Sequence, residues 1–212
     1  MAERKGIYTI LTQPSVYDFW QYCIGGHDAC RAFVREYLKP GPRDKILDLG
    51  CGTAGLCRFL PECTGYMGCD INAGYIEAAK TAYPKRGPFW QEGFAGGGMA
   101  LPLDVPRDYS VVLSMGVGHH LDGHEFRYLL ETARRLVADS VAPARFMLYD
   151  SCLTKGQSRF SRWLTLRDRG RYPRPYEFYV SVLNEFFTSV TTVVRTDLYR
   201  LPWSIIIAEA KP

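Results

Sequence analysis

Three glycines stand at a spacing that could bring a ligand against the main chain. Gly50, Gly52 and Gly55 follow the apolar run Lys45–Leu49, in an order that predicts strand, loop and helix. Glycine adopts backbone conformations that a Cβ forbids, and it lets a ligand approach the peptide groups closely. The same three glycines also satisfy the fingerprint of dinucleotide-binding proteins, so the spacing alone does not identify the ligand.

Two aspartates narrow the choice of ligand. Asp70 ends the apolar run Tyr66–Asp70, where a carboxylate can accept hydrogen bonds from both hydroxyls of a ribose. Asp48 precedes the first glycine by two residues, where its charge would oppose a pyrophosphate but would favour the ammonium and sulfonium of S-adenosylmethionine. We therefore predict that this segment binds S-adenosylmethionine. The predicted contacts are Asp48, Gly50, Cys51, Gly52, Asp70 and, beside the adenine, Ile71.

Two adjacent histidines follow the strand pattern Tyr109–Met115. Open α/β sheets bind ligands at the carboxyl ends of their strands, and histidine titrates near neutral pH. Either His119 or His120 could therefore act as a general base, with Met115 at the cofactor site. The alternative is structural: one ring caps the next helix and the other packs under the cofactor.

A basic segment follows the fifth strand pattern. Residues 155–175 contain seven Lys and Arg residues against Asp168 alone. Arginine holds phosphate or carboxylate in a bidentate fork, so this segment could bind an anionic acceptor, and its aromatic residues could line the pocket. The predicted acceptor contacts are Trp163, Arg167, Arg169, Tyr172 and Tyr176, with Arg171 and Arg174 as further candidates. A solvated surface, or an arginine paired with Asp168, remains the alternative.

The elements that position these residues alternate between strand and helix. Five strands are expected, at Lys45–Leu49, Tyr66–Asp70, Phe89–Gln91, Tyr109–Met115 and Arg145–Tyr149. Helices are expected at Ala29–Leu38, from the glycine loop through Leu60, at Ala73–Ala82 and at Glu125–Val137. This alternation predicts parallel pairing with right-handed crossovers.

The end of the chain departs from this alternation. Ser189–Thr196 and Ser204–Ala210 are rich in β-formers, and only Asp197–Trp203 separates them. No helical crossover fits in so short a link, so these two strands should pair antiparallel. The sequence therefore predicts an α/β fold with a seven-stranded, mostly parallel sheet, a terminal antiparallel hairpin and helices on both faces.

Composition restricts the class of protein. The chain has 212 residues, 47% of them hydrophobic, which suits one folded domain. No apolar run reaches the roughly 20 residues that a membrane span needs, and the N-terminus lacks an apolar signal core, so we expect a cytoplasmic protein. Cys51, Cys57, Cys63 and Cys69 recur every six residues, but they fall in different elements, so we expect no metal site.

These residues resemble those of class I S-adenosylmethionine-dependent methyltransferases. The resemblance is carried by Leu47–Gly55, by Asp70 and by Val112–Leu121. It extends to a subgroup of small bacterial-type enzymes through four short motifs. These are Val16-Tyr17-Asp18, Ile24-Gly25-Gly26, the HHL box His119-His120-Leu121 and the DRG box Asp168-Arg169-Gly170.

The resemblance implies a single Rossmann-like domain over residues 1–212. We expect a helical lid at 1–42, a cofactor-binding core at 43–150, an acceptor-side insertion at 151–187 and the terminal hairpin at 188–212. Tyr17 and Gly25 would cover the methionine end of the cofactor, and Glu92 and Phe94 would stand in for the acidic residue that relatives often carry after the third strand.

The expected reaction is methyl transfer from S-adenosylmethionine to oxygen on a small-molecule or glycan acceptor, which could be anionic. An NAD(P)-dependent oxidoreductase and a non-catalytic S-adenosylmethionine-binding module are the alternatives. An RNA methyltransferase is disfavoured because the basic segment is short and the sequence pI is only about 8.6. The sequence indicates neither the acceptor nor the oligomeric state.

Overall fold

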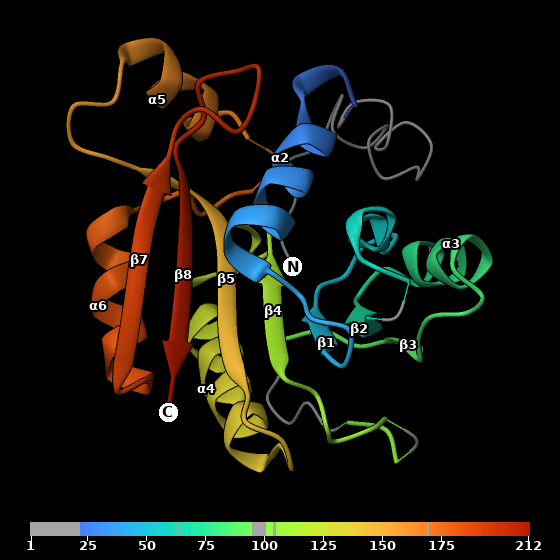
Figure 1. Ribbon diagram of the computed structural model, residues 1–212. Helices are drawn as coiled ribbons and strands as arrows, with labels where there is room; N and C mark the ends of the chain where they lie inside the picture. Colours follow the sequence, from blue (N-terminus) through green and yellow to red (C-terminus); the bar gives the residue numbers. More distant parts are fainter. Residues whose placement is uncertain (1–21, 63, 95–100, 104, 169) are drawn as a thin grey trace.

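A computed structural model describes residues 22–62, 64–94, 101–103, 105–168 and 170–212. Its centre is one twisted sheet in the order β3-β2-β1-β4-β5-β8-β7, with a two-residue strand, β6, paired to β5 off this path (Figure 1). The strands are β1 (Lys45–Leu49), β2 (Gly65–Asp70), β3 (Phe89–Gln91), β4 (Val111–Met115), β5 (Arg145–Leu153), β6 (Arg174–Pro175), β7 (Ser189–Arg195) and β8 (Ile205–Lys211).

The pairing confirms the predicted sheet. β1 lies parallel to β2 and β4, β3 is parallel to β2, and β5 is parallel to β4. β8 runs antiparallel to both β5 and β7, which forms the predicted terminal hairpin. Since parallel strands end at one edge of the sheet, the segments after β1, β2, β3, β4 and β5 meet there.

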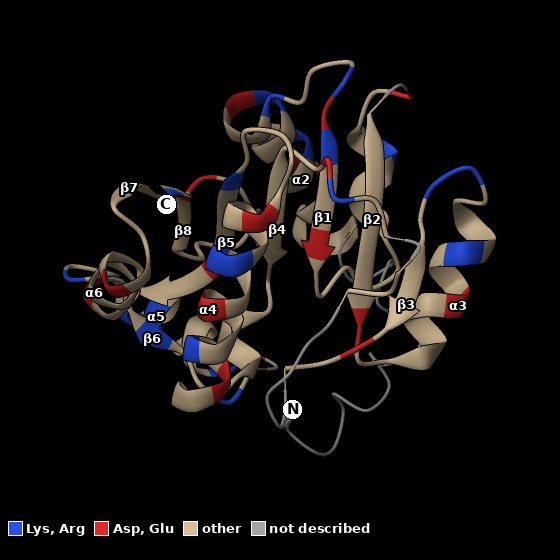
Figure 2. Ribbon diagram, turned by 90° about the horizontal axis from the view of Figure 1, so that it is seen from below, with Lys and Arg blue, Asp and Glu red and all other residues tan. Residues whose placement is uncertain are grey.

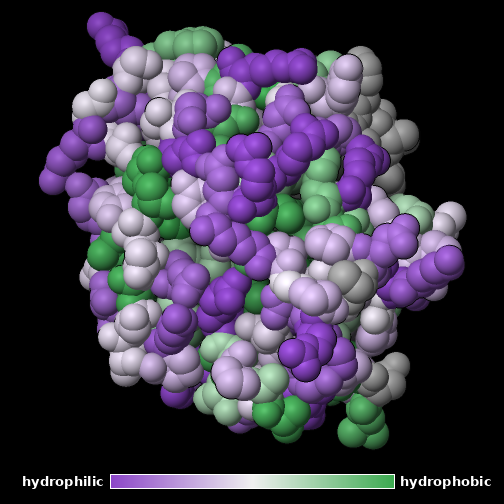
Figure 3. Space-filling model, viewed as in Figure 1, coloured by the Kyte–Doolittle hydropathy of each residue, from purple (hydrophilic) through white to green (hydrophobic). Residues whose placement is uncertain are grey.

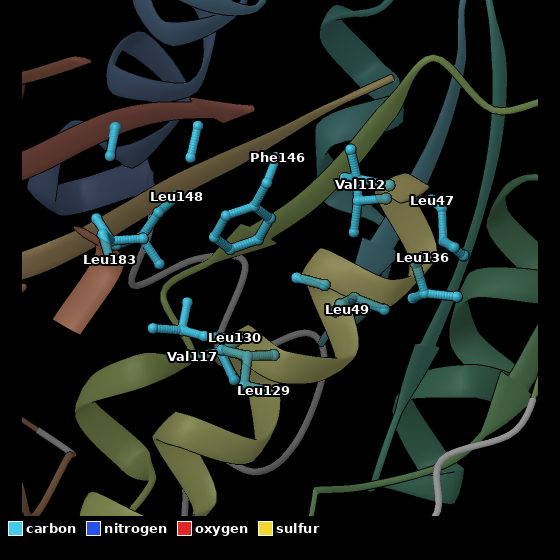
Figure 4. Packing of buried hydrophobic residues seen from close by; sticks show 14 of the residues in the cluster. Leu47, Leu49, Val112, Val117, Leu129, Leu130, Leu136, Phe146, Leu148 and Leu183 are labelled. Atoms are coloured by element: carbon cyan, nitrogen blue, oxygen red, sulfur yellow. The ribbon is translucent and has the colours of Figure 1, made fainter. Parts of the chain in front are cut away.

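Helices cover both faces of the sheet. The helical elements are α2 (Gly26–Phe33), η2 (Val34–Leu38), η3 (Gly55–Phe59), α3 (Ala73–Ala82), η4 (Gly118–His120), α4 (Gly123–Asp139), α5 (Arg159–Leu166) and α6 (Tyr176–Phe186). The core on one face joins α4 and α6 to strand residues such as Leu47, Phe146 and Leu148 (Figure 4). The other core joins α2, η2, η3 and α3 to alternate strand residues such as Ile46 and Leu113. The central strands are therefore buried on both faces, as parallel strands usually are.

Several expected boundaries change. The strand predicted from Tyr109 begins two residues later, at Val111, and the fully buried Tyr109 donates its hydroxyl to the Leu136 carbonyl at 2.9 Å. α4 begins at Gly123, where Asp122 forms a capping box with Glu125. The helix predicted after the glycine loop is only the short 3₁₀ turn η3, and the residue that precedes it, Ala54, is left-handed with φ 57°.

Residues 151–187 contain more regular structure than the sequence predicted. β5 continues to Leu153, and α5, β6 and α6 follow it. At the other end of the chain, the predicted helix Ala29–Leu38 begins earlier, at Gly26, and its last turn is the π-helical η2. Within the described residues, no helix combines the length and apolar character that a bilayer crossing requires.

Candidate functional site

The glycine loop after β1 is held against β2 by its own backbone. The amides of Gly50 and Cys51 both donate to the carbonyl of Cys69, each at 2.8 Å. Gly50 has φ +97° and Gly52 has φ +55°, a region that favours glycine. A Cβ on Gly50 would lie 2.3 Å from Cγ2 of Val117, whereas a Cβ on Gly52 would meet no atom of the described residues within 4 Å. The chain thus packs closely on one side of the loop and leaves the other side open.

Asp70 joins the glycine loop to the end of β2. Its Oδ2 accepts the amide of Gly52 at 3.0 Å, and its Oδ1 accepts the amide of Asn72 at 2.8 Å. Asn72 in turn caps α3 by accepting the amides of Gly74 and Tyr75. Each carboxylate oxygen has a second lone pair that can accept a ligand hydroxyl, so the side chain is oriented and still able to bind.

A hollow of about 320 Å³ lies in front of this loop. Its lining residues are Gly50, Asp70, Ile71, Glu92, Gly93, Phe94, Val117, Leu121 and Glu125. Among these described residues three carry carboxylates and none carries a basic side chain. Figure 2 shows the acidic residues at the ends of β2 and β3, on the glycine-loop side of the sheet. The electrostatic field there favours a cationic ligand over a diphosphate.

The hollow brings together five of the predicted cofactor residues: Gly50, Asp70, Ile71, Glu92 and Phe94. The amide of Glu92 donates to the carbonyl of Asp70 at 3.0 Å, which ties the two acidic positions together.

Sequence reasoning missed four of the lining residues. Gly93 lies between two predicted contacts, and the other three follow the strand pattern that ends at Met115. Their position after the carboxyl end of a strand was the available signal. The missed residues are Gly93, Val117, Leu121 and Glu125.

Asp48 lies behind the loop and is not among the lining residues. It is 3% exposed and accepts the hydroxyl of Tyr66 at 2.6 Å. Burial raises the pKa of Asp48 to about 7, while the bond from Tyr66 lowers that pKa and the charge of Asp70 raises it. Because side chains alternate along a strand, Asp48 lies on the same face of β1 as Ile46, on the far face from the hollow.

The other predicted cofactor residues are more scattered. Cys51 is buried under the loop, and Met115 packs against the same core as Ile46. Gly25, with φ +84°, lies against Arg200, whose amide donates to the carbonyl of Ile24. Tyr17 lies outside the described residues, so its predicted position over the cofactor stays a prediction.

His119 belongs to a buried pair with Asp150. The Nδ1 of His119 lies 2.5 Å from Oδ1 of Asp150, and the amide of His119 donates to Oδ2 of the same carboxylate at 3.1 Å. Its Nε2 faces Oδ2 of Asp168 at 3.6 Å. His120 is also buried, with its ring centroid 4.2 Å from that of His119. Asp150, in β5, was not predicted as a site residue.

The HHL and DRG boxes are in direct contact. The amide of Tyr172 donates to the carbonyl of His119 at 3.0 Å. A Cβ on Gly170 would lie 2.1 Å from Cδ2 of His119 and 2.3 Å from its carbonyl oxygen, so only glycine fits at this crossing. The residues after β4 and those between α5 and α6 therefore form one packed unit.

Arg174 anchors this unit from inside the fold. It is 7% exposed, and its guanidinium donates to the carbonyl of Gly118 at 2.6 Å and to that of Leu121 at 2.5 Å. Its carbon Cζ lies 5.0 Å from the ring centroid of Phe126 and 5.2 Å from that of Phe178. Because these bonds occupy its guanidinium, the prediction that Arg174 contacts an acceptor is not supported.

The predicted acceptor residues that the structure describes lie on different elements. Tyr176 bonds through its hydroxyl to Oγ1 of Thr192 at 2.7 Å, on β7. Tyr172 lies half-buried beside the HHL box, while Trp163 and Arg167 lie exposed on and just after α5. Arg169 lies outside the described residues. A shared pocket for these side chains therefore stays a prediction.

Comparison with known proteins finds a family match over part of the chain. Residues 46–140 match the family model described as a methyltransferase domain. An uncharacterized protein of Methanocaldococcus jannaschii is 35% identical over 69 residues, which cover 30% of this chain and 19% of that protein. The match thus spans less than a fifth of that relative.

Solved structures share the fold at low identity. Magnesium protoporphyrin IX methyltransferase (ChlM) of Synechocystis PCC 6803, solved with bound SAH, has a TM-score of 0.69 at 17% identity and covers 97% of this chain and 99% of its own. Mitomycin 7-O-methyltransferase MmcR has a TM-score of 0.62 at 14% identity, over 96% of this chain and 60% of its own. The YcgJ protein of Bacillus subtilis has a TM-score of 0.57 at 14% identity, over 87% and 98%.

The family match, the sheet order and the acid-lined hollow agree. Residues 46–140 match a methyltransferase domain, whose cofactor is S-adenosylmethionine, and the chain has the Rossmann-like methyltransferase fold.

Proposed function

We propose that the protein transfers the methyl group of S-adenosylmethionine to an oxygen of a small-molecule or glycan acceptor. The observation that carries the cofactor side of this proposal is the hollow with three carboxylates and no basic group among its described lining residues. When bound there, the cofactor supplies an electrophilic methyl group. The open side of Gly52 would admit it, and Asp70 would hold its ribose.

His119 is our candidate for the proton acceptor. A carboxylate accepts hydrogen bonds, so Asp150 fixes the proton of a neutral His119 ring on Nδ1 and leaves the lone pair on Nε2. Asp150 would also stabilise the imidazolium that forms when Nε2 takes the proton of an acceptor hydroxyl. Val117, two residues before His119, and Leu121, the last residue of the HHL box, line the hollow, which supports a position of His119 near the reacting atoms.

The acceptor would approach the Nε2 side of the His119 ring, beside Asp168. Asp168 is partly exposed and its Oδ2 lies 3.6 Å from Nε2 of His119, so an acceptor hydroxyl that donates to this nitrogen would lie beside the carboxylate. The contact between the HHL and DRG boxes supports our proposal that the chain belongs to the small subgroup that carries both. Arg167 and Arg171 remain exposed and able to bind an anionic acceptor.

The test combines radiolabelled S-adenosylmethionine with fractionated cell extract. We expect the label in a small-molecule or glycan fraction, in a product that is stable to protease and ribonuclease. Label in RNA or protein would contradict the acceptor class, and no transfer with any fraction, despite cofactor binding, would favour a non-catalytic module.

A second test addresses His119. Once an acceptor is known, His119→Gln should lower kcat by a factor of roughly 10²–10⁴ and remove the acidic limb of the pH–rate profile, while S-adenosylhomocysteine affinity stays unchanged. His124→Gln, on an exposed side chain of α4, is the matched control and should leave the profile intact. A His119→Gln variant that keeps the wild-type pH profile would exclude His119 as the base.

A further inference from the structure

Three of the four apolar side chains of α5 are exposed, and its hydroxyl side chains are buried. Phe160 is 54% exposed, Trp163 51% and Leu166 38%, whereas Ser161 is 4% exposed and Thr165 is fully buried. A surface helix of a globular protein normally shows the reverse arrangement, with an apolar stripe toward the core. Large exposed apolar side chains that gather on one element mark an interaction surface.

The inward hydroxyls fix this orientation. Nε2 of Gln157 donates to Oγ of Ser161 at 2.8 Å and to Oγ1 of Thr165 at 3.2 Å. The hydroxyl of Ser161 also bonds to the carbonyl of Pro202. Rotating α5 to bury Phe160 and Trp163 would break these bonds and expose their buried polar partners. The outward apolar stripe is therefore built into the native packing.

Basic side chains surround the stripe. Arg159 and Arg162 are exposed on α5, and Arg167 and Arg171 are exposed just after it. The acidic groups nearest in sequence have other contacts: Asp168 faces His119, and Glu177 pairs with Lys155 at 3.1 Å. The surface formed by Phe160, Trp163, Leu166 and these four arginines is called the α5 face below.

The α5 face lies at the edge of the molecule where the parallel strands end. β5 leads directly toward α5, which stands at the top of Figure 1. Figure 3 shows hydrophobic and strongly hydrophilic residues next to each other along this upper edge. We propose that the α5 face docks the protein on an anionic membrane surface, with the aromatic and leucine side chains entering the headgroup region.

The chemistry of the α5 face matches that of interfacial helices. Such helices combine Trp, Phe or Leu on one side with Lys and Arg at its margins, and lie in the plane of the interface without crossing the bilayer. Arginines next to the apolar stripe would be attracted to anionic headgroups, and that attraction weakens with salt. The docked edge of the protein would be the one that carries the catalytic site.

A nucleic acid fits this surface less well. Phe160 and Trp163 are stacked on each other with 13° between their planes, and Cζ of Arg167 lies 5.8 Å from the Trp163 ring centroid. Bases bind single-strand proteins by stacking on open aromatic faces, and both of these neighbours would compete with a base for the Trp163 ring. Leu166 adds an aliphatic group that a lipid interface accommodates and a base stack does not use.

The experiment is flotation of the full chain with phosphatidylcholine vesicles, with and without phosphatidylglycerol. We expect flotation with the anionic vesicles only, reduced by salt. The double variant Phe160→Ser, Trp163→Ser should bind about tenfold more weakly or worse, and Arg159→Gln, Arg162→Gln should lose the preference for anionic lipid. An unfolding temperature equal to that of the wild type would show that each variant is folded.

Matched control variants distinguish docking through the α5 face from nonspecific adsorption to vesicles. Val141→Ser removes a side chain that is 79% exposed, in the link between α4 and β5, and should leave flotation unchanged. Lys80→Gln, Lys85→Gln removes two exposed charges on and after α3 and should also have no effect.

Three outcomes would overturn the proposal. The first is equal flotation of wild type and the aromatic double variant. The second is tighter binding of a single-stranded RNA oligonucleotide than of vesicles, lost in that variant. The third is a dimer in sedimentation velocity that the variant abolishes, which would assign the α5 face to a second copy of the chain. None of these outcomes depends on methyl transfer.

Discussion

The two halves of the ligand-binding edge differ in charge and in how their residues are held. Over β1, β2 and β3 the hollow is acidic, and a glycine loop and the ends of strands supply most of its lining. Over β5 the segment from α5 to β6 is basic, and its contacts to the HHL box come from residues more than 45 positions away in sequence, as between His119 and Tyr172. Figure 2 shows both halves.

The difference shows when charged residues in a sequence indicate ligand binding. The acidic residues Asp70 and Glu92 do line the hollow, because Asp70 ends β2 and Glu92 directly follows β3. The arginines of the basic half differ in their burial. Arg174 is buried in bonds to Gly118 and Leu121, while Arg171 stays exposed.

Replacing Arg174 should give the largest change and tests whether the basic half is held from inside. Arg174→Met would leave the carbonyls of Gly118 and Leu121 without their charged donor, at a cost of about 3 kcal/mol or more in the free energy of unfolding. Arg171→Met, at an exposed site, should change that free energy by less than about 0.5 kcal/mol. Urea denaturation measures both, and equal effects would show that Arg174 is not an anchor.

Replacing each of the two loop glycines by alanine tests how closely the acidic half is packed around the loop. Gly50→Ala places a Cβ against Val117 at a positive φ, and should cost roughly 2–4 kcal/mol of stability. Gly52→Ala meets open space, so only the left-handed backbone cost of about 1–2 kcal/mol applies. Thermal melts would compare them; a larger loss for Gly52→Ala would contradict the packing described for this loop.

Asp48 gives a smaller, pH-dependent effect. Its pKa is raised to about 7 in the folded protein, so between about pH 4 and pH 7 the folded state keeps a proton that the unfolded state has lost. This group's contribution therefore lowers stability as pH rises through that window, and the loss is complete above it.

Asp48→Asn removes the titrating group and keeps an oxygen for Tyr66. We expect it to be roughly 1–2 kcal/mol more stable than wild type at about pH 8, with no gain at about pH 4, because its weaker bond to Tyr66 offsets part of the desolvation cost. Urea titrations at both pH values provide the measurement. A variant that is less stable than wild type at the higher pH would argue that Asp48 is charged and compensated in the native state.

Local patterns made much of the fold predictable. The bounds of β1, α3 and β3 match the sequence prediction, since apolar runs of fixed period and a flanking turn define them. α5 was missed because its apolar residues face outward and its hydroxyls inward, so its sequence lacks the pattern of a core-facing helix.

The site residues also divide into those that local sequence patterns predict and those that they do not. Gly50, Asp70 and Glu92 could be predicted because each stands next to a recognisable strand end. Asp150 could not, because its role depends on how β5 packs against the loop after β4. Nothing in the local sequence separates the buried Arg174 from its exposed neighbour Arg171.

Calorimetric titration with S-adenosylhomocysteine, on wild type, Asp70→Ala and the exposed control Asp139→Ala, tests the acid-lined hollow most directly. We predict binding to the wild type and to Asp139→Ala, and at least tenfold weaker binding to Asp70→Ala, consistent with the loss of charge-assisted hydrogen bonds worth about 1.5–3 kcal/mol. Unchanged affinity in Asp70→Ala, or wild-type protein that binds NADH instead, would contradict the account.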